Sequence, residues 1–231
     1  MIYIGIDDTD TKESRGTGKL ARNIAAELAK HCRIFGVTRH QLLVHPDIPF
    51  TSHNSCAVIH AEAPDSEANQ LYEVAKKMML EDFIEGSDPG IAIATGTQLT
   101  PANVAFGLDA KKIVVTQVRA KEVAKNSSIR FDPLGGTGNG IIGAIAGIGL
   151  ASTRNDGRFL LKGKNRELAA GTRTVSELLK AGIDQVLALN GEAVNDETVE
   201  VLKNAVPSFV QGRAVLFVEK RDGCLIALKR D

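Results

Sequence analysis

The chain begins with an apolar, β-branched run, Ile2 to Ile6, that stops at three aspartates, Asp7, Asp8 and Asp10. A run of this length and composition predicts a buried strand. Carboxylates this close repel one another, and each titrates less readily than an isolated acid. The pattern therefore predicts that something positive lies among these acids, at the end of the strand.

Strand-like and helix-like segments alternate along most of the chain, which predicts an α/β fold, with α+β as the alternative. A capping box is expected where Thr174 is followed by Glu177, and Asp222-Gly223 is typical of a hairpin turn. A boundary near residue 165 would separate a nucleotide-binding region, 1–165, from a C-terminal α/β extension, 166–231. The expected strands are 2–6, 33–44, 56–63, 91–94, 159–162, 214–219 and 224–229, and the expected helices are 17–28, 65–83, 101–110, 118–127, 141–150 and 175–180.

Composition argues against several classes of protein. Lys plus Arg and Asp plus Glu both number 28, so the net charge of zero does not indicate a strongly basic nucleic-acid binder. The three cysteines form no C-x-x-C pair, so a zinc ribbon is not expected. The longest apolar stretch, Ile141 to Ala151, is too short to cross a bilayer. We expect a cytoplasmic protein without a membrane partner, and the oligomeric state is left open.

The acidic segment has the chemistry of a metal–nucleotide site. Mg²⁺ prefers carboxylate oxygens and keeps waters and substrate phosphates as its other ligands, so Asp7, Asp8 and Asp10 are predicted metal ligands and catalytic residues. The N–H groups of Gly16, Thr17 and Gly18 at the start of the next helix are predicted to bind phosphate. The alternative is a solvated loop in which an aspartate caps a turn.

Two cations nearby are candidates for balancing charge. Lys19 or Arg15 would neutralise charge in a phosphoryl-transfer transition state. The segment is not a Walker A loop, because Leu20 follows Gly18-Lys19 and Glu13 occupies the position of the first glycine.

A second glycine-rich segment precedes the apolar helix that begins near Ile141. Its glycines match the spacing of a dinucleotide fingerprint, but position 163 carries Gly where an acid is expected, so a Rossmann site is disfavoured. Two readings stay open, a phosphate cradle and a turn that allows close helix packing. The predicted phosphate-binding residues are Gly136, Thr137, Gly138, Asn139 and Gly140.

Polar residues in and after the second expected strand are candidates for substrate binding. Ser52, His53 and Asn54 offer a hydroxyl, an imidazole and an amide, and Arg39-His40 could meet a phosphate or a base. A Ser-His catalytic dyad is not expected, because neighbours along an extended chain point to opposite sides. For Arg39-His40 the alternative is a surface pair.

In this order, these segments resemble archaeal tRNA-Ile2 agmatinylcytidine synthetases. The matching pieces are Ile4 to Asp10, Asp47 to Ser52, Asp88 to Ile91 and Gly136 to Gly149, and the resemblance covers roughly residues 1–165. It implies a kinase-like α/β core with a ferredoxin-like neighbour. It also implies ATP and Mg²⁺ as cofactors, with Asp7, Asp8 and Asp10 on the metal–nucleotide.

The chain departs from that family at two places. The family has a short G-M-C-T-T after its acids, where this chain has TKESRGTGK, and the OB-fold and zinc ribbon that hold tRNA are not recognised here. We therefore expect a stand-alone relative, an ATP- and Mg²⁺-dependent phosphotransferase-like enzyme. Its acceptor would be a small molecule, or it would act with a partner subunit, and RNA binding would be weak. The alternative is a nucleotide-sensing or RNA-binding module without catalysis.

Overall fold

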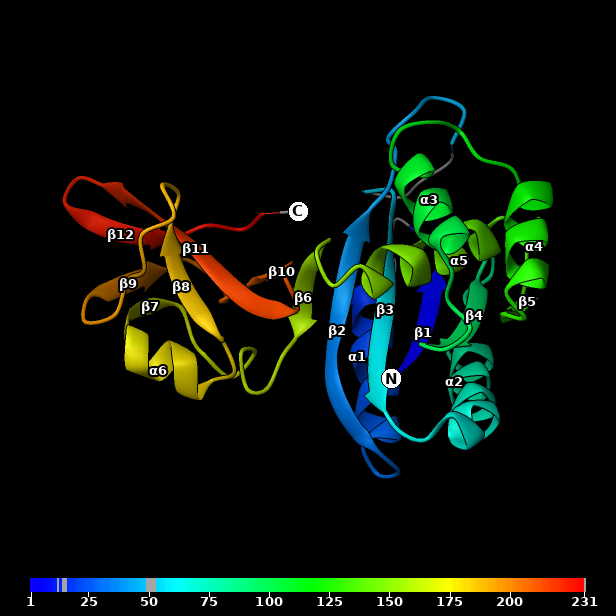
Figure 1. The fold of residues 1–231 in the computed structure, drawn as a ribbon, viewed down its shortest axis with the longest axis horizontal. Coiled ribbons are helices and arrows are strands. Elements are labelled where there is room, and N and C mark those ends of the chain that lie inside the picture. Colours follow the sequence, from blue (N-terminus) through cyan, green and yellow to red (C-terminus); the bar gives the residue numbers. More distant parts are fainter. Residues whose placement is uncertain (12, 14–15, 49–52, 231) are drawn as a thin grey trace. The chain divides into compact units, whose positions relative to one another are not determined.

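The computed structural model describes residues 1–11, 13, 16–48 and 53–230 (Figure 1). The chain divides into two compact units, Met1–Thr153 and Arg154–Asp231. The division expected near residue 165 falls inside the second unit. Asn165 is fully buried in that unit, where its Nδ2 donates to the carbonyl of Ala205 at 3.0 Å.

The first unit is built on an antiparallel sheet with the strand order β5-β4-β1-β3-β2. The order β4-β1-β3-β2, with a helix after β1 and another after β3, is the ferredoxin-like βαββαβ arrangement. Antiparallel pairing in a sheet with helices corresponds to the α+β alternative. The strands are β1 (Ile2–Asp7), β2 (Arg33–Gln41), β3 (Ser55–Glu62), β4 (Gly90–Thr95) and β5 (Arg130–Pro133).

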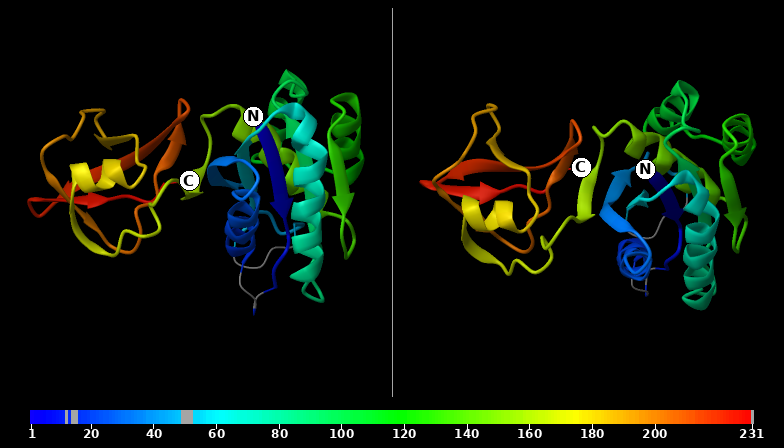
Figure 2. Two further views of the ribbon diagram at one scale, coloured as in Figure 1. Left: turned by 90° about the horizontal axis from the view of Figure 1, so that it is seen from below. Right: turned by 60° about the horizontal axis from the view of Figure 1, so that its bottom comes forward.

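Helices cover both faces of this sheet (Figure 2). Side chains alternate along β1, so Tyr3, Gly5 and Asp7 share the face that carries α5. Ile2, Ile4 and Ile6 are fully buried on the other face. The helices are α1 (Thr17–Leu28), α2 (Ala68–Glu81), α3 (Pro101–Asp109), α4 (Gln117–Asn126) and α5 (Gly140–Ser152), with a 3-10 turn, η1, at Asp65–Glu67.

The α5 backbone lies directly against the sheet. A Cβ atom added to Gly5 would sit 2.2 Å from the carbonyl oxygen of Ala144, and one on Gly147 would sit 2.6 Å from the sulfur of Cys56. A Cβ on Gly143 would overlap the Asp7 carboxylate, at 1.7 Å from Oδ2. The glycines of α5 therefore allow close helix packing, which is one of the two interpretations given for the second glycine-rich segment.

The second unit carries the strand order β6-β10-β11-β12-β9-β7, and β8 pairs in parallel with β11. Val175, Leu178 and Leu216 belong to its separate apolar core. Its elements are β6 (Arg158–Leu161), β7 (Gly171–Thr174), α6 (Val175–Lys180), β8 (Gln185–Ala188), β9 (Thr198–Val201), β10 (Ser208–Val210), β11 (Arg213–Arg221) and β12 (Cys224–Ala227).

Several local predictions are confirmed. Helix α1 begins at Thr17, and the capping box of Thr174 with Glu177 is formed at α6. Asp222 and Gly223, with φ of 49° and 82°, make the turn between β11 and β12. Across the described ranges, every helix is too short or too polar to cross a membrane.

Candidate active site

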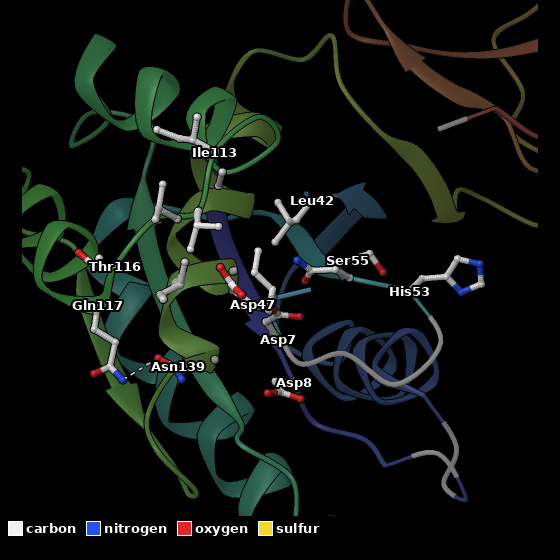
Figure 3. Close-up of a pocket in the computed structure, with 18 of the residues that line it drawn as sticks. Asp7, Asp8, Leu42, Asp47, His53, Ser55, Ile113, Thr116, Gln117 and Asn139 are labelled. Atoms are coloured by element: carbon white, nitrogen blue, oxygen red, sulfur yellow. Dashed lines mark hydrogen bonds between the residues drawn. The ribbon is translucent and has the colours of Figure 1, made fainter. Parts of the chain in front are cut away.

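A cavity of about 480 Å³ opens in the first unit where β1 ends (Figure 3). The acidic loop after β1 lines one side, and the connection between β2 and β3 lines another. The segment 110–118 and the first turn of α5 complete its wall. Its size lies within the range of small-molecule and cofactor sites.

Asp7 and Asp8 point into this cavity from the end of β1 (Figure 3). Burial beside α5 and the neighbouring Asp8 raise the pKa of Asp7 to about 8. Burial, Asp88 and Asp10 raise the pKa of Asp8 to about 6. Asp8 has a φ of 51°, in the left-handed region that few residues other than glycine adopt. The loop therefore holds two mutually repulsive acids at the cavity, as functional sites commonly do.

The described lining of the cavity is acidic. Four aspartates, Asp7, Asp8, Asp10 and Asp47, line the cavity, and none of the described lining residues is a lysine or an arginine. The positive partner predicted from the sequence is therefore not a lining side chain within the described ranges. A cation from solution would suit this donor set.

The three predicted metal ligands do not form a three-carboxylate metal site in this arrangement. Among the residues that the structure describes, no three His, Cys, Asp or Glu side chains are close enough together to hold a metal ion. Mg²⁺ in nucleotide sites commonly uses one or two carboxylates together with substrate phosphates and waters. The donor set therefore fits a metal that arrives with a phosphorylated ligand.

The start of α1 braces the acidic loop through Thr17. The Thr9 hydroxyl donates to the Thr17 hydroxyl at 3.1 Å, and the Thr17 hydroxyl donates to Oδ1 of Asp10 at 3.2 Å. Thr17 lines the cavity, whereas Gly16 and Gly18 do not. Lys19 is exposed and lies outside the cavity lining, so its predicted catalytic role has no support in this geometry.

The Gly-rich loop, residues 135–140, is already occupied by a carboxylate of the chain itself. The backbone N–H groups of Gly138 and Asn139 donate to the Asp88 carboxylate at 2.6 and 3.0 Å. The Thr137 hydroxyl donates to the same group at 2.5 Å. The predicted phosphate donors at Thr137 and Gly138 are therefore engaged within the protein.

Only the end of the Gly-rich loop reaches the cavity. Asn139 and Gly140 line it, whereas Gly136, Thr137 and Gly138 do not. The Gln117 side-chain amide donates to the Thr137 carbonyl at 2.9 Å and to Oδ1 of Asn139 at 2.8 Å. Figure 3 shows this second bond at the cavity edge.

The predicted substrate contacts are split by the fold. His53 and Asn54 line the cavity. His40 is fully buried, with Nε2 2.7 Å from the Thr38 hydroxyl, and Arg39 donates to the Ser55 hydroxyl at 2.9 Å. Neither Arg39 nor His40 lines the cavity, so they are not substrate contacts in this arrangement. Ser52 and Arg15 lie outside the described residues.

The sequence reading missed the apolar wall of the cavity. Ile113, Val114 and Val118 line it, and their side chains are 51%, 45% and 67% exposed. Nothing in the local sequence indicates that these side chains would stay exposed, because their exposure is set by the fold. Asp47 begins one of the matching motifs but was not predicted to be a site residue, and it supplies a fourth carboxylate to the cavity lining.

Comparison with known proteins shows which proteins this chain is similar to. No protein-family model matches the chain. A protein of Methanocaldococcus jannaschii, described as uncharacterised, is 31% identical over 150 residues, which are 65% of this chain and 50% of that protein. The tRNA(Ile2) 2-agmatinylcytidine synthetase TiaS of Methanopyrus kandleri is 29% identical over 171 residues, 71% of this chain and 37% of the enzyme. TiaS of Cenarchaeum symbiosum is 26% identical over 151 residues, 64% of this chain and 33% of the enzyme.

This chain is homologous to TiaS over about two thirds of its length. The crystal structure of apo TiaS has the same fold over 64% of this chain, with a TM-score of 0.55 at 24% identity, and that match covers 35% of the TiaS chain. A tRNA fluorescent labeling enzyme gives a TM-score of 0.56 at 25% identity over the same share of this chain and 35% of that chain. The resemblance inferred from the sequence motifs is confirmed, and the chain spans between a third and a half of the curated relatives that it matches.

Proposed function

We propose that this chain is an ATP- and Mg²⁺-dependent phosphotransferase-like enzyme related to TiaS. The observation that carries the proposal is the cavity with Asp7 and Asp8 at its acidic end and no described lysine or arginine in its lining. A triphosphate could enter such a site only with cations that neutralise both the phosphates and the aspartates. Binding of nucleotide and metal would therefore be mutually dependent.

The lining residues suggest how the parts of a nucleotide would be held. Asp7 and Asp8 would supply oxygen ligands for Mg²⁺, which when bound neutralises charge on the phosphates, with Asp10 nearby on the same lining. The N–H groups in the first turn of α5, at Gly140, would bind phosphate oxygens, while the Thr17 hydroxyl keeps its hydrogen bond to Asp10. The apolar wall at Ile113 to Val115 offers a surface for a nucleobase.

The choice of ATP is supported by a relative of known fold. One similar structure, with a TM-score of 0.55 and 24% identity, is TiaS in complex with tRNA(Ile2) and ATP, and another is TiaS with AMPCPP and agmatine. We extend ATP to this chain as the nucleotide. We leave open whether the acceptor is a small molecule or RNA, and whether the chain acts with a partner subunit.

The proposal is tested by titrating the protein with ATP in the presence and absence of Mg²⁺ by calorimetry. We expect binding only with Mg²⁺. Asp8→Asn should weaken it about 10–100-fold, because a charged ligand is lost. Asn tolerates the left-handed backbone at this position and removes a charge that the neighbouring acids repel, so the metal-free variant should be at least as stable as the unaltered protein.

Asp222 provides a matched control. It also has a positive φ, 49°, but lies in the β11–β12 turn of the second unit, so Asp222→Asn should leave ATP affinity unchanged. If Asp8→Asn bound ATP–Mg²⁺ as tightly as the unaltered protein, the role of Asp8 would be refuted.

Turnover separates the enzyme from the alternative, a nucleotide-sensing or RNA-binding module. ADP release with a candidate acceptor, above the rate for Asp8→Asn, would identify a phosphotransferase. Tight ATP–Mg²⁺ binding with no ADP release for any acceptor offered would favour a sensor.

RNA binding is tested by gel-shift titration with tRNA at two salt concentrations. The chain has zero net charge, so we expect non-specific binding with Kd near 10⁻⁴–10⁻⁶ M and a steep loss at higher salt. Salt-resistant binding tighter than about 10⁻⁷ M would exceed the non-specific range and would make RNA the preferred acceptor.

A further inference from the structure

We infer that Asp88 is a positioning residue that joins the acidic loop to the Gly-rich loop and so fixes two sides of the cavity. Asp88 does not line the cavity, so it acts through the residues that it holds. Its effect on nucleotide binding rests on the function proposed above, whereas its effect on the two loops does not.

The backbone of Asp88 contacts one loop and its side chain contacts the other. The Asp88 N–H donates to the carbonyl of Asp8 at 3.1 Å, next to the left-handed backbone of that residue. The carboxylate accepts the N–H groups of Gly138 and Asn139 and the Thr137 hydroxyl. A single residue therefore determines the spacing between Asp8 and the start of α5.

The neighbouring glycines allow this connection to be short. Gly136 has a φ of 57°, and a Cβ on it would lie 2.8 Å from Cβ of Asp88. A Cβ on Gly140 would lie 2.1 Å from the Asp88 carbonyl oxygen, and one on Gly90 would lie 2.1 Å from the Gly140 carbonyl carbon. The Asp88-Pro89-Gly90 segment and the Gly-rich loop are thus in backbone contact, which leaves little freedom for either to shift.

This connection matters because the acids on the cavity side repel one another. The pKa values of Asp7 and Asp8 are both raised, and the charge of Asp88 contributes to each shift. Placing a third carboxylate beside them costs free energy unless its own charge is stabilised. Two backbone N–H groups and a hydroxyl provide that stabilisation. Asp88 can therefore serve as a rigid connector despite its acidic neighbours.

The test combines a variant of Asp88 with amide hydrogen exchange by NMR and with ATP–Mg²⁺ calorimetry. Asn offers one acceptor oxygen where the carboxylate offers two, so Asp88→Asn cannot hold all three donors. We expect exchange at the Gly138 and Asn139 amides to accelerate at least about tenfold, while amides in the centres of β1 and β3 keep their protection. The ATP–Mg²⁺ affinity should fall about 10–100-fold.

A milder variant guards against misfolding. Thr137→Val removes one donor to Asp88 and changes no charge, so the affinity should fall about three- to tenfold. Asp184→Asn is the matched control, because the Asp184 carboxylate also accepts a backbone N–H, that of Ala214 at 2.7 Å, in the second unit. It should leave both loop exchange and ATP affinity unchanged.

The outcomes separate this inference from the proposed function. If the loop amides of Asp88→Asn exchanged at the unaltered rate, the connector would be refuted whatever the nucleotide result. If they exchanged faster but both variants bound ATP–Mg²⁺ as the unaltered protein does, the positioning role would be refuted. If the unaltered protein did not bind ATP–Mg²⁺, the proposed function would fail, and the amide exchange would still decide whether Asp88 holds the loop.

Discussion

The acidic loop and the Gly-rich loop both have the composition of ligand-binding segments, but the fold leaves them in opposite states. The acidic loop directs Asp7 and Asp8 into the cavity, and the described lining offers no lysine or arginine to neutralise them. The Gly-rich loop offers donors for an anion, and those at Gly138 and Asn139 are already bound to Asp88. Among the described residues, the acidic loop would gain from an added cation, whereas the anion-binding donors of the Gly-rich loop are largely engaged by Asp88.

This difference shows what a glycine-rich motif does and does not indicate. Glycines allow a backbone to approach an anion, but that anion can be a side chain of the same protein. In this chain they also allow α5 to lie against the sheet, as Gly143 does beside Asp7. The glycines of this region therefore serve mainly close packing. Within the Gly-rich loop, only Asn139 and Gly140 reach the cavity, where they could contact a ligand.

The largest effect is expected on the Gly-rich side, for Gly140→Ala. The added Cβ would lie 2.1 Å from the Asp88 carbonyl oxygen, and backbone cannot move aside as a flexible side chain can. We expect the free energy of unfolding to fall by about 3 kcal/mol or more in urea denaturation. Gly96→Ala is the control, since its Cβ would meet only the Met1 carbonyl at 3.6 Å. Equal losses for the two variants would remove the packing role of Gly140.

An intermediate effect is expected on the acidic side, for Asp7→Asn. The folded-state pKa of Asp7 is raised to about 8 from 3.8, so the carboxyl group favours folding when protonated. This contribution is complete below about pH 4 and is lost as the pH rises to about 8. In metal-free urea denaturation, the variant should gain about 1–3 kcal/mol over the unaltered protein between pH 5 and pH 9. Parallel pH profiles would contradict the repulsion inferred for this loop.

The smallest effect is expected for Lys19→Ala. Lys19 follows the acidic loop in sequence but is exposed and outside the cavity lining, so ATP–Mg²⁺ affinity should change less than about twofold. Calorimetry with ATP–Mg²⁺ on Lys19→Ala and Asp8→Asn compares the losses of affinity of the two variants. A loss as large as that of Asp8→Asn would restore Lys19 to the site.

The sequence predicted those features that depend on neighbours along the chain. The start of α1 at Thr17 and the capping box of Thr174 depend on a few adjacent residues, and both are confirmed. Strand β5 (Arg130–Pro133) is not among the expected strands, because it is short and ends in proline. It is recognisable as a strand only through its pairing with β4.

In the candidate site, too, the sequence predicted features that depend on adjacent residues and missed those that depend on distant ones. The acids of β1 were found because they adjoin one another, whereas Asp88 and Gln117 were not assigned to the site. Their roles depend on hydrogen bonds to residues 20 to 51 positions away. His40 was misjudged for the reverse reason, since a polar pair in sequence gave no sign that the sheet would bury it.

The glycine face of α5 also determines where this cavity can change during evolution. Gly140 and Gly143 contribute main chain to its wall, and a side chain at either position would collide with Asp88 or Asp7. Substitutions at these two positions are therefore poorly tolerated, and this part of the wall remains main chain. The segments 42–48 and 110–118 contribute exposed side chains such as Asp47 and Ile113 to the rest of the lining, and these can be exchanged without moving the sheet. Descendants of this scaffold would acquire new ligands through those two segments, while the main-chain part of the wall is inherited unchanged.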